Sequence, residues 1–389
     1  MSNNFTPIEK TNRIQSLDVM RGFALLGIFL VNMISFHSPF LYYDPYEWWS
    51  APNDHFHYQW IDIFVQASFY PLFAMLFGYG TALQKQRADA RGVNYWPIGL
   101  RRFFFLLCIG SIHAFLIWSG DILINYAVLG FLLLLMLRFS GKTLLIIGSI
   151  LFVIPNVFIS IMLLLLSKVD PTSVIIWTDL TGMKSSISSY TTDSFQVIMK
   201  QRLADWTAVN NIQNMFLLFI AIFPMMLIGA GAAKLDLLTK WTQLKKKLFA
   251  MFLFFFLVAV LLKYTPYLFE KNLAYIFVQD SLGGPLLATA YAVGIVLMVE
   301  SSIGMKITKP LASAGRMSLT NYLMQSIVGT FLFYGYGIGL YGKISLTTGT
   351  MLVFAIFIMQ VILSELWLLK FKQGPIEKVW RMLTYGKSK

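Results

Sequence analysis

The sequence has little charge and almost no cysteine for a chain of its length. Only 13% of its 389 residues are charged and 57% are hydrophobic, whereas soluble domains carry about 25% charged residues. The single cysteine, Cys108, excludes a disulfide framework and any CxxC metal or redox motif. GxSxG, phosphate-loop and dinucleotide-binding glycine motifs are also missing. The composition therefore excludes an ordinary soluble enzyme and indicates a polytopic membrane protein.

Long apolar runs dominate the rest of the chain. About 20 apolar residues cross a bilayer core as a helix, and continuous rather than alternating runs favour helices over a barrel. We predict an all-α membrane helix bundle, a single integral-membrane domain over 1–389. Its transmembrane helices, about ten on this pattern, are predicted at 15–36, 60–84, 101–119, 122–138, 143–167, 211–233, 247–263, 284–300, 316–335 and 348–369. The loop 168–210 is predicted to be extracytoplasmic, with an amphipathic piece near Val197–Trp206.

The net charge of +13 reports orientation rather than a nucleic-acid partner. Most Lys and Arg fall in connections on the side of the N-terminus, such as "KQRADAR" and "KKK". Most acids fall on the other side, among them Asp44, Glu47, Asp54, Asp170 and Asp179. Because positive loops stay inside, both termini are predicted to be cytoplasmic, with the basic side against anionic lipid.

Polar residues enter the first predicted helix, "RIQSLDVMRGFALLGIFLVNM". Asp18 and Arg21 are three residues apart and share a helix face that continues towards Asn32. An ionisable group at membrane depth costs about 2.5–3.5 kcal/mol on insertion scales, so it needs an explanation. The pair is either an interfacial ion pair that ends the helix or part of a binding site.

A second polar group lies in "SAGRMSLTNYLMQS". Ser318, Asn321 and Gln325 form a stripe on one helix face, with Arg316 at its start. The stripe either lines a binding route, or Ser318 caps the helix while the two amides bond to neighbouring helices. Arg101 and Arg102 extend a basic rim on the same side, which is either topological or able to hold a phosphate.

The predicted outer side holds all four histidines, and "IHAFLIWSGDILINYAVLG" holds the most informative one. Asp121 either caps the following helix or orients His113 as a general base, with Asn125 facing the same cavity. From its local sequence, His57 is expected to be an exposed histidine in a loop. Its spacing from His55 does not suit zinc, so we predict no metal site.

These motifs resemble one bacterial family. "RIQSLDVMRGFALLGIFLVNM", "LFGYGTALQKQRADARG", "IGSIHAFLIWSGDILINYAVLG", "SAGRMSLTNYLMQS" and "FKQGPIEKVWRMLTYG" are similar, in this order from about residue 13 to 386, to the YeiB-like family of inner-membrane proteins, whose biochemical function is unknown. The resemblance implies a multi-pass protein of the bacterial inner membrane.

"SLDVMRG" also resembles the opening of the transmembrane acyltransferase superfamily, which includes heparan glucosaminide N-acetyltransferase. Those enzymes move an acyl group from a cytoplasmic coenzyme A thioester to an acceptor across the membrane. Their His-x-x-Trp-x-Gly pattern is matched by His57 and Trp60, which implies a catalytic role for His57. Asp62 replaces the glycine and Ala67 an expected aspartate, so His113 is the alternative base.

The resemblance implies an acyltransferase-like protein that uses acyl-CoA as co-substrate and has no tightly bound cofactor. Arg21 and Arg316 would meet the donor phosphates, with Asp18 beside them and Ser318, Asn321 and Gln325 along the route. The expected partners are membrane lipids and a small-molecule, lipid or sugar acceptor. A homodimer is one of the assemblies left open. A transporter or exporter, or a membrane partner without turnover, remains the alternative.

Overall fold

Every regular element of the described part of the chain is a helix. The computed structural model describes residues 14–240 and 245–386. Seven segments are long and apolar enough to cross a membrane. They are α1 (Gln15–His37), α3 with α4 (Pro52–Phe64, Phe69–Ala90), α5 with the π-turn η3 (Trp96–Ile112, His113–Ile117), α7 (Gly141–Val169), α10 (Ile212–Lys234), α14 through the π-turn η6 to α15 (Leu273–Val278, Gln279–Gly283, Gly284–Val299) and α18 (Leu346–Lys370). The protein is thus an all-helical membrane bundle, as predicted.

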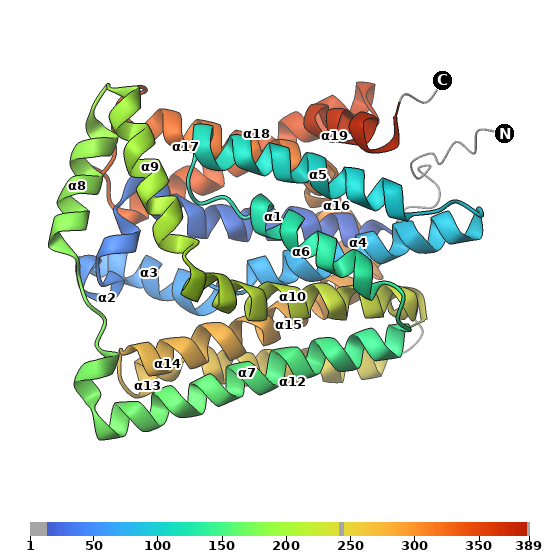
Figure 1. The fold of residues 1–389 in the computed structure, drawn as a ribbon, viewed down its shortest axis with the longest axis horizontal. Helices are drawn as coiled ribbons and strands as arrows, with labels where there is room; N and C mark the ends of the chain where they lie inside the picture. Colours follow the sequence, from blue (N-terminus) through green and yellow to red (C-terminus); the bar gives the residue numbers. More distant parts are fainter. Residues whose placement is uncertain (1–13, 241–244, 387–389) are drawn as a thin grey trace.

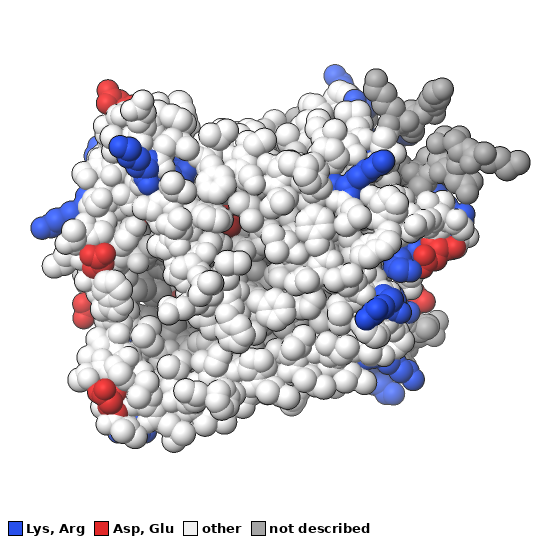
Figure 2. All heavy atoms as spheres, in the orientation of Figure 1, with Lys and Arg blue, Asp and Glu red and all other residues white. Residues whose placement is uncertain are grey.

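Three further helices overlap the remaining predicted spans 122–138, 247–263 and 316–335. They are α6 (Leu123–Met136), α12 (Lys245–Lys263) and α17 (Ser318–Phe333). α6 and α17 are shorter than the others, and α12 carries lysines at both ends. The longer helices run along the longest axis of the molecule (Figure 1). On the face seen in Figure 2, charged side chains gather at the two ends of this axis, and a broad band of uncharged surface lies between them.

The predicted helix 60–84 is broken ahead of Pro71. α3 ends at Phe64 and α4 begins at Phe69, with Ala67 between them in the left-handed region at φ 57°. Pro71 is the third residue of α4, where the missing N–H would have no partner within the helix. The proline therefore starts a helix here and does not kink one.

Short helices close the end of the bundle at which α8 and α9 lie, called here the α8–α9 end (Figure 1). They are η2 (Phe40–Tyr42), α2 (Pro45–Trp48), η4 (Pro171–Val174), α8 (Leu180–Thr191), α9 (Phe195–Val209) and α13 (Thr265–Leu268). The amphipathic piece predicted near Val197–Trp206 lies within α9. Of its polar residues, Lys200 is exposed, whereas Gln201, Arg202 and Asp205 are buried in the protein and do not form the wet face that a surface helix would have.

The described chain starts and ends at the opposite end, called here the terminal end (Figure 1). This end carries α11 (Leu237–Lys240), α16 (Ser302–Arg316) and α19 (Pro375–Tyr385). α16 was not anticipated as a separate helix. It packs closely on α1, because a Cβ on Gly22 would lie 2.0 Å from the Leu311 carbonyl oxygen and one on Gly315 would lie 1.9 Å from that of Asp18. α1 is central to the bundle, in contact with α4, α15, α16, α17 and α18.

Candidate functional site

Five arginines surround a cavity of about 200 Å³ at the terminal end, called here the arginine cavity. They come from α1, α4, α5, α16 and α19, and are Arg21, Arg87, Arg102, Arg316 and Arg381. Glu377 of α19 is the one acidic residue among the lining side chains. Its carboxylate anchors α19 to the start of α17. It accepts hydrogen bonds from the N–H of Leu319 (2.8 Å), the N–H of Thr320 (3.1 Å) and the Thr320 hydroxyl (2.5 Å). The cavity therefore suits an anionic ligand.

The wall of the arginine cavity becomes apolar and aromatic away from its arginines. Leu25 and Ile28 follow Arg21 along α1, and the neighbouring helices add Phe73, Phe77, Leu106, Tyr126 and Tyr322. Arg102 lies against this wall, with its guanidinium 5.4 Å from the Phe77 ring centre and 5.0 Å from that of Trp380. It also donates a hydrogen bond to Gln84. A ligand with an anionic head and an apolar tail would match this polarity.

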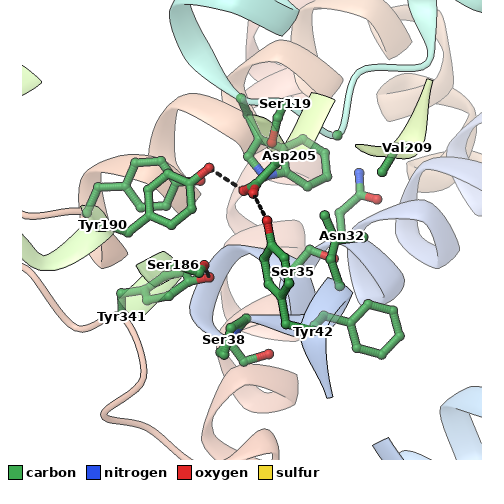
Figure 3. A pocket seen from close by; sticks show the side chains of 16 residues that line it. Asn32, Ser35, Ser38, Tyr42, Ser119, Ser186, Tyr190, Asp205, Val209 and Tyr341 are labelled. Carbon is green, nitrogen blue, oxygen red and sulfur yellow. Dashed lines mark hydrogen bonds between the residues drawn. The ribbon is translucent and has the colours of Figure 1, made fainter. Parts of the chain in front are cut away.

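A second cavity, of about 210 Å³, lies at the α8–α9 end and is called here the tyrosine cavity. Its polar and aromatic lining includes Asn32, Ser35, Ser38, Tyr42, Trp118, Ser119, Ser186, Tyr190, Asp205, Tyr334 and Tyr341 (Figure 3). Asp205 accepts hydrogen bonds from the hydroxyls of Tyr42 and Tyr190 (both 2.6 Å) and from the Gln201 amide (2.8 Å). Burial raises the pKa of the Asp205 carboxyl, and the three hydrogen bonds oppose that rise. The carboxylate thus fixes two of the tyrosines that shape the cavity.

A histidine–aspartate pair lies between the two cavities. The Nδ1 of His113 is 2.7 Å from Oδ1 of Asp121, and neither side chain is exposed. The other carboxylate oxygen accepts the N–H of Ile124 at 2.8 Å, so Asp121 both caps α6 and orients the histidine. The Nε2 of His113 is buried and has no partner among the described residues. This nitrogen is the one left for a reactant.

The chain around Asp121 separates the cavities. Residues 118–120 line the tyrosine cavity, and residues 122 and 123 line the arginine cavity. One face of α1 also serves both. Arg21, Leu25 and Ile28 line the arginine cavity, and Asn32 and Ser35, at the same three- and four-residue spacing, line the tyrosine cavity.

Several predicted site residues meet at these cavities. Arg21, Arg316 and Ser318 line the arginine cavity, and Asn32 lines the tyrosine cavity. Asp18 is buried and accepts a hydrogen bond from Arg21 at 3.0 Å, so it holds that guanidinium by an ion pair.

The rest of the predicted stripe on α17 lies in a helix interface. Asn321 donates to the Ser364 hydroxyl at 3.0 Å, and Gln325 donates to Gln360 at 3.0 Å, both on α18. These amides therefore join two helices and line neither of the two cavities. Asn125, expected to face the same cavity as Asp121, donates to Asn210 at 3.2 Å and joins α6 to the end of α9.

His57 lies on α3, half-buried, and lines neither of the two cavities. The two positions at which its motif departs from the acyltransferase pattern have structural uses. Asp62 is buried and accepts hydrogen bonds from Tyr267 (2.8 Å), Gln279 (2.8 Å) and Tyr46 (3.0 Å). Ala67 forms the left-handed break before α4.

Sequence reasoning did not single out Arg87, Arg381, Glu377, Asp205 or the tyrosines. Arg102 was identified only as part of a basic rim with Arg101, and Arg101 proves to be exposed. The arginines were hidden by the positive-inside bias, which places similar residues in loops with no site. Among residues 14–240 and 245–386, no three His, Cys, Asp or Glu side chains group as metal ligands.

Comparison with known proteins adds the family. A model described as "Protein of unknown function (DUF418)" matches residues 232–387, which include Arg316, Tyr322 and Glu377. The chain is similar to the uncharacterized protein YxaH of Bacillus subtilis (strain 168), with 34% identity over 97% of this chain and 96% of YxaH. It is also similar to an uncharacterized 39.9 kDa protein in the amylase 3' region of Bacillus acidopullulyticus (29% identity, covering 98% and 96%) and to the uncharacterized protein YeiB of Escherichia coli (strain K12) (28% identity, covering 95% of each). With relatives matched over nearly their whole length, this chain belongs to the YeiB-like family of membrane proteins.

Proposed function

We propose that this protein is a membrane acyltransferase that takes an acyl group from acyl-CoA in the arginine cavity and delivers it to an acceptor in the tyrosine cavity. The observation that carries the proposal is the buried His113–Asp121 pair between two cavities that lie towards opposite ends of the bundle. An enzyme whose donor and acceptor come from opposite sides of a membrane needs a base at such a place.

The arginine cavity supplies what an acyl thioester donor requires. Its guanidiniums suit the phosphates of the nucleotide end, because arginine binds phosphate oxygens through paired N–H groups. Its apolar wall suits the acyl chain, which then lies nearer to His113. The positive-inside bias supports placing this end on the cytoplasmic side of a bacterial inner membrane, where coenzyme A esters occur.

The chemistry assigned to His113 is general base and then general acid catalysis. Its Nε2 takes the proton from an acceptor hydroxyl or amine as that atom attacks the thioester carbonyl. The carbon–sulfur bond breaks, and the leaving sulfur receives the proton from the imidazolium. Asp121 keeps the proton of the neutral ring on Nδ1 and stabilises the imidazolium while it exists.

Donor binding is the first test, since it does not require a known acceptor. The purified protein in mild detergent is melted with coenzyme A, acetyl-CoA and longer acyl thioesters. A ligand at 100 times its Kd stabilises the fold by about 2.7 kcal/mol. The stabilisation should be lost in Arg21→Ala and Arg316→Ala and kept in Arg101→Ala, whose arginine is exposed. No shift with any thioester would overturn the donor assignment.

Transfer is the second test. Inverted membrane vesicles with and without the protein are given acyl-CoA labelled in the acyl group, and label is followed into extracted lipids and saccharides. We expect His113→Gln to lower transfer by a factor of about 10²–10⁴ while donor binding persists, and His57→Gln to retain transfer. The reverse result would move catalysis to His57, the residue that the superfamily motif implies.

Transport is the second candidate, because two cavities separated by a closed layer also fit an alternating-access carrier. It predicts substrate flux that depends on membrane potential or pH, and no covalent transfer of label. Thioester-independent flux lost in Arg21→Ala would favour this candidate over the enzyme.

A further inference from the structure

His113 lies between two aromatic side chains that belong to different cavities. The ring of Tyr322, which lines the arginine cavity, is centred 5.1 Å from the imidazole. The ring of Trp118, which lines the tyrosine cavity, is centred 6.3 Å from it. Both aromatic residues are less than 7% exposed, and the His113 side chain is not exposed at all. Neither cavity therefore reaches the histidine in this conformation.

Local structure holds Trp118 between His113 and the tyrosine cavity. The backbone N–H of Trp118 donates to the His113 carbonyl at 2.8 Å, which closes the π-turn η3. Its ring is centred 4.3 Å from that of Phe36. It also covers Gly120, where a Cβ would lie 2.2 Å from the indole. The absence of a side chain at position 120 thus leaves the space that the indole fills.

Tyr322 is positioned by a helix that is tied to the mouth of the other cavity. It lies one turn after Ser318 on α17, and the first turn of α17 is anchored by the Glu377 carboxylate of α19. α19 itself contributes Arg381 to the arginine cavity. A displacement of α19 by a ligand at the arginines would therefore act on the helix that carries Tyr322.

We infer that Trp118 and Tyr322 are two gates, one on each side of His113, that admit the acceptor and the acyl donor separately. This inference rests on the proposed function, which identifies the two molecules that pass the gates. A reactive thioester beside a base must be kept from water, because water would attack the carbonyl and release a carboxylic acid and free coenzyme A. Two bulky rings that enclose the base provide that exclusion.

The gates can be tested by thiol labelling in sealed vesicles, without any acyl donor. Cys108 is the only cysteine, so a Cys108→Ala background is free of thiols. Ile28→Cys reports on the arginine cavity and Ser35→Cys on the tyrosine cavity, both from one face of α1. A membrane-impermeant maleimide is added to vesicles of each orientation, and the preparation in which Ser35→Cys reacts identifies the tyrosine-cavity side.

From that side, Ile28→Cys should stay unlabelled when both aromatic residues are present. In a Trp118→Ala/Tyr322→Ala double variant it should become labelled to the level of Ser35→Cys. The matched control is Trp177→Ala/Tyr336→Ala, which removes a tryptophan that is 72% exposed and a tyrosine that is 38% exposed. Labelling of Ile28→Cys with both gates intact would overturn the inference. So would its protection in a double variant whose Ser35→Cys still reacts.

Catalysis gives a separate readout. In Trp118→Ala, release of free coenzyme A should exceed acyl transfer, whereas in Trp177→Ala the two should stay equal. If the labelling pattern is as expected but no variant transfers label, the gates stand and the acyltransferase falls. If transfer is found while the labelling pattern fails, the enzyme stands and the gates fall.

Discussion

At the scale of single residues, Asp121 combines two roles that the sequence presented as alternatives. One carboxylate oxygen caps α6 and the other holds His113. Asp121→Asn should therefore keep the cap, because an amide oxygen can still accept the N–H of Ile124. It should lose the acceptor for Nδ1–H, and we expect acyl transfer to fall by about 10²–10⁴.

The control for this variant is Asp54→Asn, which alters another carboxylate that accepts a helix-terminal N–H, that of Thr347. Melting curves of the two variants should be alike, and only the first should lose transfer. Full activity in Asp121→Asn would remove the aspartate from the mechanism.

Asp205 gives a prediction about pH at the same scale. Burial raises the pKa of this carboxyl above its usual 3.8, while hydrogen bonds from Tyr190 and Tyr42 and the nearby Arg202 lower it. The folded state therefore binds the proton more tightly than the unfolded state does. The residue favours folding most at low pH, and that contribution is lost as the pH rises from 3.8 through the raised folded pKa.

Melting temperatures measured across this range should show the effect. Asp205→Asn cannot ionise, so the wild type should lose stability relative to this variant as the pH rises through the window. A constant difference between the two proteins at every pH would contradict the raised pKa.

At the scale of helices, α4 and α10 cross at two glycines. A Cβ on Gly78 would lie 1.9 Å from the Met226 carbonyl oxygen, and one on Gly229 would lie 1.9 Å from that of Met75. Gly78 and Gly229 thus permit a close contact between the two helices. Gly80 differs, because a Cβ there would meet only the Arg21 guanidinium, at 3.5 Å.

Gly78→Ala should therefore destabilise the protein, since a backbone carbonyl cannot move aside as a side chain can. The expected cost is about 1–3 kcal/mol, seen as a lower melting temperature or as loss of monodisperse protein in detergent. Gly80→Ala is the matched control and should melt close to the wild type. Equal melting of both variants would mean that the helices can separate at no cost.

At the scale of the whole molecule, the two ends of the bundle are predicted to face different compartments. A fluorescent protein that matures only in the cytoplasm should fluoresce when fused after the C-terminal residue. Alkaline phosphatase, active only outside the cytoplasm, should be active when inserted after Asp193 in the turn between α8 and α9. The opposite pattern would place the arginine cavity outside and exclude a cytoplasmic acyl-CoA as its ligand.

The sequence by itself determined the class of the protein and much of its helical plan. Hydrophobic runs report burial in lipid along the chain, so composition and run length sufficed for an all-helical membrane bundle. The spacing of Asp121 from His113 across a tight turn also indicated the pair, because residues on either side of a hairpin meet through local geometry alone.

Only the tertiary structure decided which polar residues share a cavity. Arg87, Arg102 and Arg381 lie on three different helices, with Arg381 far from the other two in the chain. Each reads as an ordinary cytoplasmic charge until these helices bring them together. Conversely, Asn321 and Gln325 look like a binding stripe until α18 packs against them and takes up their hydrogen bonds. A periodic pattern shows that a helix face is polar, but which helix packs on that face follows from the fold.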